Sequence, residues 1–345
     1  MTTIAGMNGT IRIALAPVID RDGAWGGVWI SGSPEDASLV STHAELLSND
    51  VGALRLLLDI GAMPDALVAS LPPERTSVVV NADSANMSQS HTFSSVVVGQ
   101  DFIPGVTSHR QMEDAKLAGS IWFSGPYIAH PPVVEGKKDS SRATLLKLLT
   151  LIADDADSAE IEMVFKREPE LSFNLFRLVN SVSMGLKSKI TTFNQAIMVL
   201  GRRQMQRWIQ LMLYTRHQHG SDAPNPLLQQ AAMRGRLMER FAGSLGWDAG
   251  KQEQAFMAGI FSLLDTLLGM TMNEILVIIK LPDDVQSALL GQGGDLSEML
   301  MLVERLQAGD RSSSMPAFLS LSPEQFADCQ FDALKWASGM GQEMG

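Results

Sequence analysis

Few residues of this chain have the types and spacing that metal-dependent hydrolysis needs. Such enzymes hold a divalent cation between neutral imidazole nitrogens and carboxylate oxygens, and the bound cation activates water. His217 and His219 lie two residues apart, which places them on different faces of a helix and favours a solvated helix end over a metal pair. The acidic run at 154–157 is more typical of a helix junction with an N-cap than of a cation site. The six histidines are His43, His91, His109, His130, His217 and His219.

Other catalytic patterns are missing from the sequence. It contains no G-x-S-x-G, C-x-x-C or H-E-x-x-H motif and no P-loop. The glycine-rich stretch 291–295 has no strand-like run before it and no Lys-Ser/Thr after it, so it predicts a connection between helices. The single cysteine, Cys329, excludes an internal disulfide framework and all-cysteine zinc sites. We therefore expect no catalytic residue, no cofactor and no metal.

Length and net charge limit the class of protein. With 345 residues the chain is long enough for two domains, each with its own core. A net charge of −11 argues against a general affinity for nucleic-acid phosphates or anionic lipids. Residues 1–10 lack the pattern of a signal peptide, and no apolar run reaches the ~18 residues of a membrane span. We expect a cytoplasmic protein that contacts neither nucleic acid nor membrane.

The first part of the chain, residues 1–132, has the pattern of an α/β domain. Short β-rich runs alternate with helical patterns at 44–58 and 108–117, which suggests parallel βα units. The domain ends at Pro131-Pro132, because a proline pair disfavours helix, and the polar stretch 133–141 reads as a linker. The strand-like runs are at 11–18, 27–30, 76–80, 95–98 and 121–123.

Residues 142–345 have the pattern of an all-helical domain with a helical tail. Apolar residues recur at helical spacing, and in the last such set Phe326, Cys329, Ala333 and Trp336 attach the tail to the body. Repeated helix starts support the prediction, because a short polar side chain is followed three residues later by Glu or Gln, as in a capping box. The pairs are Thr192 with Gln195, Thr271 with Glu274, Asp295 with Glu298, and Ser322 with Gln325.

Within the helical region, one set of residues resembles the pattern of HDOD domains. These all-helical modules of bacterial signalling proteins are similar to HD phosphohydrolases that have lost their metal ligands, and the resemblance covers roughly residues 140–280. Pro can start a helix, and Asn and Ser can bond the backbone at a turn, so we expect structural roles for the set. Its members are Pro169, Leu171, Asn180, Ser181, Ala196 and Gly201.

The HDOD resemblance also predicts where a metal site would have been. HD phosphohydrolases carry an adjacent His-Asp pair on a Gly-initiated helix, and none of the six histidines precedes an aspartate. At the matching place, in 259–265, the chain has Ser262 and Leu263. Asp265 is the one acidic residue there, and one carboxylate does not hold a metal alone.

The first domain resembles EAL phosphodiesterases, and the segment 259–269 resembles proteins in which an EAL-like domain precedes HDOD. The run 16–29 is similar to the opening strands of that fold, and 105–107, 115–119 and 123–127 are similar to its last βαβ unit. The catalytic Glu of the EAL motif would fall near Trp29, and an indole does not ligate a metal. With about 130 residues against ~200 or more for a full barrel, we expect a reduced, incomplete and non-catalytic barrel.

Together these features predict a non-catalytic bacterial signal-transduction protein that regulates other signalling proteins through protein–protein contacts. The alternative is a sensor of cyclic di-GMP or another nucleotide that lacks hydrolase activity, and a surviving phosphohydrolase is the third hypothesis. An incomplete barrel leaves strand edges or an apolar face to be covered by the helical domain, a partner, or a second copy in a homodimer. Trp25, Trp29 and Trp122 could supply such a face or fill the domain's own core.

Overall fold

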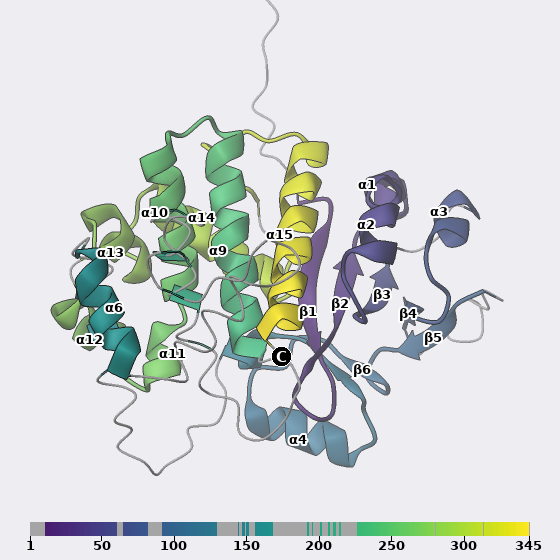
Figure 1. The fold of residues 1–345 in the computed structure, drawn as a ribbon. Helices are drawn as coiled ribbons and strands as arrows, with labels where there is room; N and C mark the ends of the chain where they lie inside the picture. Colours follow the sequence, from purple (N-terminus) through teal and green to yellow (C-terminus); the bar gives the residue numbers. More distant parts are fainter. Residues whose placement is uncertain are drawn as a thin grey trace, which may run out of the picture.

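We describe a computed structural model of the chain, drawn in Figure 1. It places a mixed sheet beside a group of helices, as the two-part sequence pattern predicts. The structure describes residues 11–60, 65–81, 92–129, 156–167, 226–279, 281–312 and 314–344, with isolated positions between 144 and 214. The predicted linker 133–141 lies outside the described residues.

Seven strands form one sheet in the order β5-β4-β3-β2-β1-β7-β6. Strands β2 to β5 are parallel, β6 is parallel to β7, and β1 is antiparallel to both of its neighbours. The strands are β1 (Ala14–Ile19), β2 (Trp25–Ser31), β3 (Arg55–Asp59), β4 (Thr76–Val80), β5 (Ser94–Val97), β6 (Phe102–Ile103) and β7 (Trp122–Phe123).

The sheet curls into a nearly closed barrel. A single bridge between Val98 and Phe102 joins its two ends. The interior is filled by side chains rather than open, as in other small barrels. Those side chains are Val18, Leu57, Val79, Val96 and Phe102, with Trp29, Val98 and Trp122 packed against them. The prediction of an α/β domain with an incomplete barrel is confirmed at this level.

The helical prediction for 44–58 is wrong in its second half. Helix α2 (Ala44–Asn49) ends early, and β3 begins at Arg55. Leu56, Leu57 and Leu58 are fully buried between β2 and β4. A strand buried on both faces is a continuous apolar run, which the sequence pattern does not distinguish from a buried helix.

Both groups of helices lie outside the curled sheet, whose inside is filled by side chains: the first short helices lie to the right of the strands in Figure 1 and the longer helices to the left. The predicted helix at 108–117 is confirmed as α4 (His109–Leu117), with Ser108 accepting from the Gln111 N–H at 3.2 Å. The helices beside the strands also include α1 (Ala37–Thr42) and α3 (Asp65–Ser70). The second group is α6 (Ser158–Arg167), α9 (Pro226–Ser244), α10 (Ala249–Phe261), α11 (Leu264–Leu268), α12 (Met272–Ile278), α13 (Asp283–Leu289), α14 (Asp295–Gln307) and α15 (Pro323–Met344).

The predicted helix starts are largely confirmed. Thr271 accepts from the Glu274 N–H at 3.3 Å, and the Glu274 carboxylate accepts from the Thr271 N–H at 2.8 Å. Ser322 with Gln325 forms the same reciprocal pair, and Thr192 accepts from the Gln195 N–H. The start at Asp295 is displaced by one residue, because Gly294, with φ of 89°, is the N-cap and Asp295 is the first helical residue.

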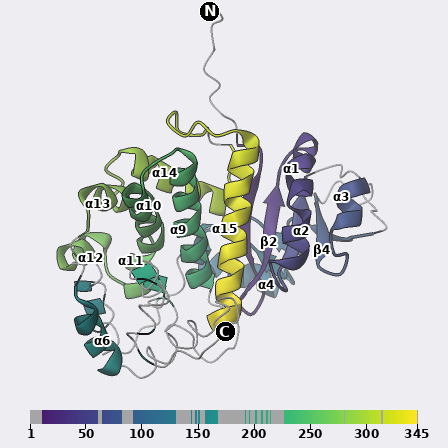
Figure 2. The same cartoon turned by 45° about the horizontal axis from the view of Figure 1, so that its top comes forward.

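The last two helices pack directly on the sheet. Figure 2 shows α15 lying between α9 and the strands. The side-chain amide of Gln330, fully buried, accepts from the Leu15 N–H at 3.1 Å and donates to the Ile13 carbonyl at 2.9 Å. Strand β7 pairs with β1 at Ile19 alone among the described residues, so Gln330 satisfies an edge that has no strand beside it.

The sheet and the helices share one hydrophobic core. A single cluster of buried side chains extends from the strands through α15 to α9 and α10. His43 stacks on Phe331 of α15 at a centroid distance of 4.1 Å, and Thr266 of α11 donates to the Ala129 carbonyl at 2.7 Å. The uncovered part of the barrel is therefore closed by the chain's own C-terminal helices. No described helix is long and apolar enough to span a membrane.

Candidate functional site

The first candidate centre is the mouth of the barrel at the carboxyl ends of β2 and β3. Parallel strands of barrels carry functional side chains at this end. The register places Ser31 beside Asp59. Two residues earlier on each strand, it places Trp29 beside Leu57. The Trp29 ring points into the barrel, where it meets Phe102 edge-on at 5.3 Å.

Asp59 is the acidic group of this mouth. Its burial raises the pKa of the carboxyl above the ordinary value. The positive charge of Arg311 and the nearby indole N–H of Trp29 oppose part of that rise. The same Trp29 N–H is buried without a hydrogen bond of ordinary geometry, so it only partly compensates the carboxylate.

A turn from the helical half closes this mouth. Gly309 follows the end of α14, has φ of +80°, and lies against the Trp29 ring so closely that a Cβ there would overlap the indole. Two residues later, Arg311 donates from Nη1 to the Arg12 carbonyl at 3.3 Å. The mouth is therefore filled by protein groups.

The second candidate centre lies among α9, α10 and α14. Arg234 of α9 is only 3% exposed, and its guanidinium donates three hydrogen bonds to side chains of the helical half. Nη1 donates to the Ser262 hydroxyl at 2.8 Å and to the Glu304 carboxylate at 3.0 Å, while Nε donates to the Gln307 side-chain oxygen at 3.0 Å. Burial lowers the pKa of Arg234, and the charge of Glu304 opposes that effect.

Two glycines bring the backbones of this centre together. A Cβ at Gly259 of α10 would lie 2.6 Å from the Gly235 Cα of α9, so only glycine permits the approach. Ser262, the C-cap of α10, thereby comes within reach of Arg234.

Neighbouring polar groups at this centre are also engaged. Tyr214 donates to the Ile260 carbonyl at 2.6 Å, and burial raises the pKa of its hydroxyl far above the ordinary value. Asp265 accepts from the Thr266 N–H at 2.7 Å, at the start of α11. Leu263 is buried. The arrangement is a packed, internally paired centre.

The structure separates the predicted positions into two places. Ser262, Leu263 and Asp265 lie together at the α10–α11 junction, whereas Trp29 lies in the barrel. Across the part of the chain that the structure describes, no three His, Cys, Asp or Glu side chains are close enough to hold a metal ion.

Most of the residues that carry the HDOD resemblance lie outside the part of the chain that the structure describes. Pro169, Leu171, Asn180, Ser181 and Ala196 lie outside the described residues. Gly201 is described, is exposed and has φ of 73°, which fits the glycine requirement of a left-handed position.

The sequence interpretation did not include six residues that build these centres. One signal was present: the segment 227–242 carries three arginines among apolar residues, which predicts paired charges on a packed helix but does not single out Arg234. A glycine directly after an amphipathic helix, at 309, predicts a left-handed C-cap but not what it touches. The six are Asp59, Arg234, Glu304, Gln307, Gly309 and Arg311.

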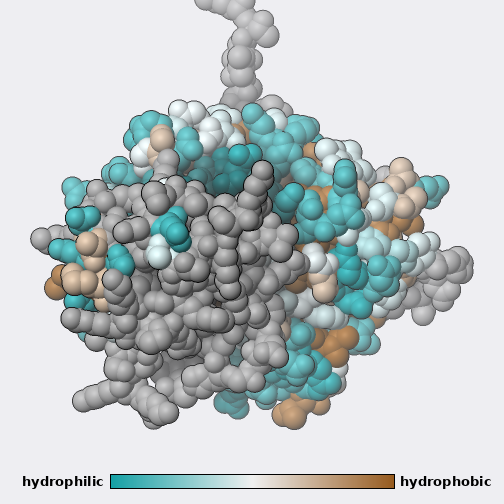
Figure 3. Space-filling view, in the orientation of Figure 1, coloured by the Kyte–Doolittle hydropathy of each residue, from teal (hydrophilic) through white to brown (hydrophobic). Residues whose placement is uncertain are grey.

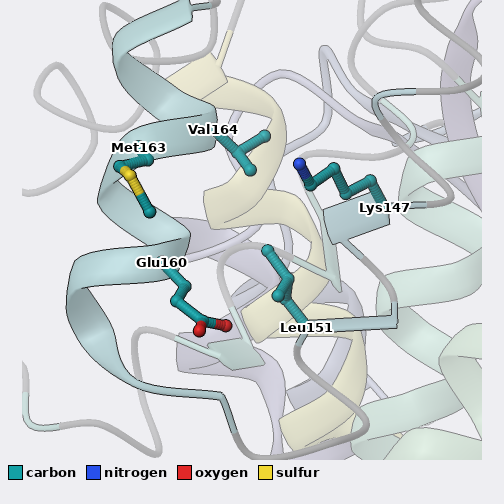
Figure 4. A pocket seen from close by; sticks show the side chains of 5 residues that line it. All are labelled: Lys147, Leu151, Glu160, Met163 and Val164. Carbon is teal, nitrogen blue, oxygen red and sulfur yellow. The ribbon is translucent and has the colours of Figure 1, made fainter.

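Two surface cavities are described, and neither adjoins these centres. The first, of about 140 Å³, lies beside α6 (Figure 4). The second, of about 330 Å³, lies between the starts of α10 and α14 and includes Trp247 and Lys251. The residues that line the first are Lys147, Leu151, Glu160, Met163 and Val164.

Exposed apolar side chains are scattered among the described elements. Leu117 of α4 is 87% exposed, and Val277 of α12 is 86% exposed. On the face drawn in Figure 3, the described apolar atoms form separate patches rather than one surface. Isolated exposed apolar residues are common in proteins and do not by themselves mark a docking surface.

Comparison with known proteins finds one family whose model matches the middle of the chain. The family model of the HDOD domain matches residues 141–276. Residues 141–276 are therefore similar in sequence to HDOD domains. The match ends within α12, so α14 and α15, which close the barrel, lie beyond the matched HDOD residues.

Two curated relatives have similar sequences. The Bacillus subtilis protein YuxH, described as uncharacterized, is 26% identical over 239 residues, which are 68% of this chain and 58% of that protein. The cyclic di-GMP phosphodiesterase CdgJ of Vibrio cholerae is 26% identical over 207 residues, 59% of this chain and 47% of that protein. The chain thus spans about half the length of the curated relatives it matches.

One solved structure has a weak overall likeness. It is a candidate phosphohydrolase from Shewanella amazonensis SB2B, at 14% identity and a TM-score of 0.42. The likeness covers 59% of this chain and 93% of that one.

Proposed function

We propose that the protein is a non-catalytic regulator that acts on other signalling proteins through protein–protein contacts. The observation that carries the proposal is the buried guanidinium of Arg234, bonded to Ser262. Ser262 and Leu263 stand where the HD resemblance would place a His-Asp pair. A fixed cation thus occupies the neighbourhood in which a hydrolase of that kind would hold its metal.

The positive charge of Arg234 disfavours the binding of a divalent cation at this centre. Two unit charges 4 Å apart interact by ~4 kcal/mol at the effective dielectric of a protein, so the Arg234 guanidinium disfavours a divalent ion beside it, while the charges of Glu304 and Asp265 oppose part of that repulsion. Glu304 is the carboxylate that reaches Arg234, and it is already engaged by it. A metal at Ser262 would have to displace Arg234 first.

The alternative proposal is a sensor of cyclic di-GMP that lacks hydrolase activity. The similarity to CdgJ, a cyclic di-GMP phosphodiesterase, supports it. The EAL-like resemblance of the barrel would place such a ligand at the mouth beside Trp29. That mouth is filled by Gly309 and lies beside Arg311, so a sensor would need this turn to move.

Binding measurements on the purified full chain test both proposals. For the regulator, we expect calorimetric titration with Mn²⁺ and Mg²⁺ to show no stoichiometric site, and labelled cyclic di-GMP to show no saturable binding up to ~100 μM. Saturable dinucleotide binding without metal would favour the sensor. A stoichiometric metal site that is lost in Asp265→Ala would contradict both proposals.

A further inference from the structure

One short segment of the chain contacts both candidate centres. Glu304 and Gln307, three residues apart on α14, accept from Arg234 in the helical centre. Gly309 and Arg311, which follow directly, lie at the barrel mouth beside Trp29 and Asp59. We propose that residues 304–311 couple the two centres, so that a change at one alters the other, whether or not the protein turns over a substrate.

The helical end of this segment is held firmly. Gln307 is 1% exposed, accepts from Arg234, and donates from Nε2 to the Gln230 carbonyl of α9 at 3.2 Å. Glu304 and Gln307 lie on one face of α14 because residues three apart on a helix are neighbours. A shift of Arg234 therefore has to move the last turn of α14 or break buried hydrogen bonds.

Backbone hydrogen bonds fix the path of the chain from the last turn of α14 to the barrel. The Asp310 N–H donates to the Arg305 carbonyl and the Gly309 N–H donates to the Leu306 carbonyl, both at 2.9 Å. This is the Schellman pattern, which fixes the chain direction after a helix. The Asp310 side chain accepts from the Ser312 N–H at 2.8 Å, which stabilises the residues that follow the turn.

The barrel end of the segment meets side chains that belong to the barrel interior. The ring of Trp29 lies between Gly309 and Phe102. Arg311 provides the charge that opposes the effect of burial on Asp59. A movement of Trp29 or a change in the charge of Asp59 would therefore act directly on the turn at 309–311.

A nuclear magnetic resonance experiment on the full-length protein tests the coupling. The reporter is the Nε–H signal of Arg234, identified by its loss in Arg234→Lys. Gly309→Ala places a methyl group against Trp29, while Arg311→Gln removes a charge from the mouth without adding bulk. We expect each variant to shift this signal and to speed its exchange with water by about two- to thirty-fold, the range of coupling along such networks.

Gly246→Ala is a matched control. Gly246 also ends a helix in the Schellman pattern, with φ of 74°, but a Cβ there would meet no atom within 4 Å. It therefore carries the same backbone strain without the contact to Trp29, and the Arg234 signal should keep its wild-type position and exchange rate.

Coupling must also act in the opposite direction, because linkage is reciprocal. Ser262→Ala removes one acceptor of Arg234 and should shift the indole N–H signal of Trp29, which has no direct contact with Ser262. An Arg234 signal unchanged in both Gly309→Ala and Arg311→Gln would overturn the proposal. Equal shifts in Gly246→Ala would overturn it as well, since they would show that helix-end strain alone is sufficient.

Discussion

Replacing Gln330 by Leu tests whether the C-terminal helix substitutes for a missing strand beside β1. The substitution keeps a similar volume but leaves the Leu15 N–H and the Ile13 carbonyl without their partner at a buried position. Each unpaired buried backbone group costs ~1–3 kcal/mol, and removing a buried amide returns ~1 kcal/mol. We expect the free energy of unfolding to fall by ~1–5 kcal/mol.

Urea unfolding of the full chain, followed by helical circular dichroism, measures this change. The matched control is Gln254→Leu on α10, where the side chain is half-exposed and should change stability by less than ~0.5 kcal/mol. Because the sheet and helices share one core, the tryptophan fluorescence transition should shift together with the helical one. A loss below ~0.5 kcal/mol for Gln330→Leu would refute the substituted-strand reasoning.

Three further predictions follow from the described residues. Burial raises the pKa of Asp59, so the fold loses stability as the pH rises above the ordinary aspartate pKa of 3.8 and the buried carboxyl ionises. Asp59→Asn should therefore raise the melting temperature at pH 7. An unchanged or lower melting temperature would contradict this. Burial also raises the pKa of Cys329, and we expect a thiol reagent at pH 8 to modify it only in denaturant; rapid labelling of the native protein would show the site to be open. Residues 1–132 expressed alone should aggregate or self-associate, because α14 and α15 no longer cover the sheet; a stable, monodisperse monomer would contradict the shared core.

Local patterns predicted elements well where their boundaries carry turn or cap residues. The capping pairs at Thr271 and Ser322 are contacts within three residues, so sequence spacing specifies them. Strand β3 was missed because Leu56, Leu57 and Leu58 form an apolar run with no alternation. Its strand character comes from β2 and β4 on either side, which no local window contains.

The candidate centres depend on contacts between distant parts of the chain. Gly309 meets Trp29 across 280 residues, and Arg234 meets Glu304 across 70. Sequence reasoning singled out Trp29, Ser262 and Asp265, but it did not predict which residues surround them. The burial of Arg234 among α9, α10 and α14, and the pairing of β1 with the Gln330 side chain, follow from tertiary packing that leaves no local pattern.

A turnover assay tests the central claim most directly. The purified full chain would be incubated at micromolar concentration with cyclic di-GMP and Mg²⁺ or Mn²⁺, and product nucleotides would be measured over hours. The account predicts no product above the protein-free control, because Arg234 occupies the helical centre and residues 309–311 fill the barrel mouth. Metal-dependent hydrolysis that is abolished in Ser262→Ala or Asp265→Ala, and that remains in Gly246→Ala, would contradict it.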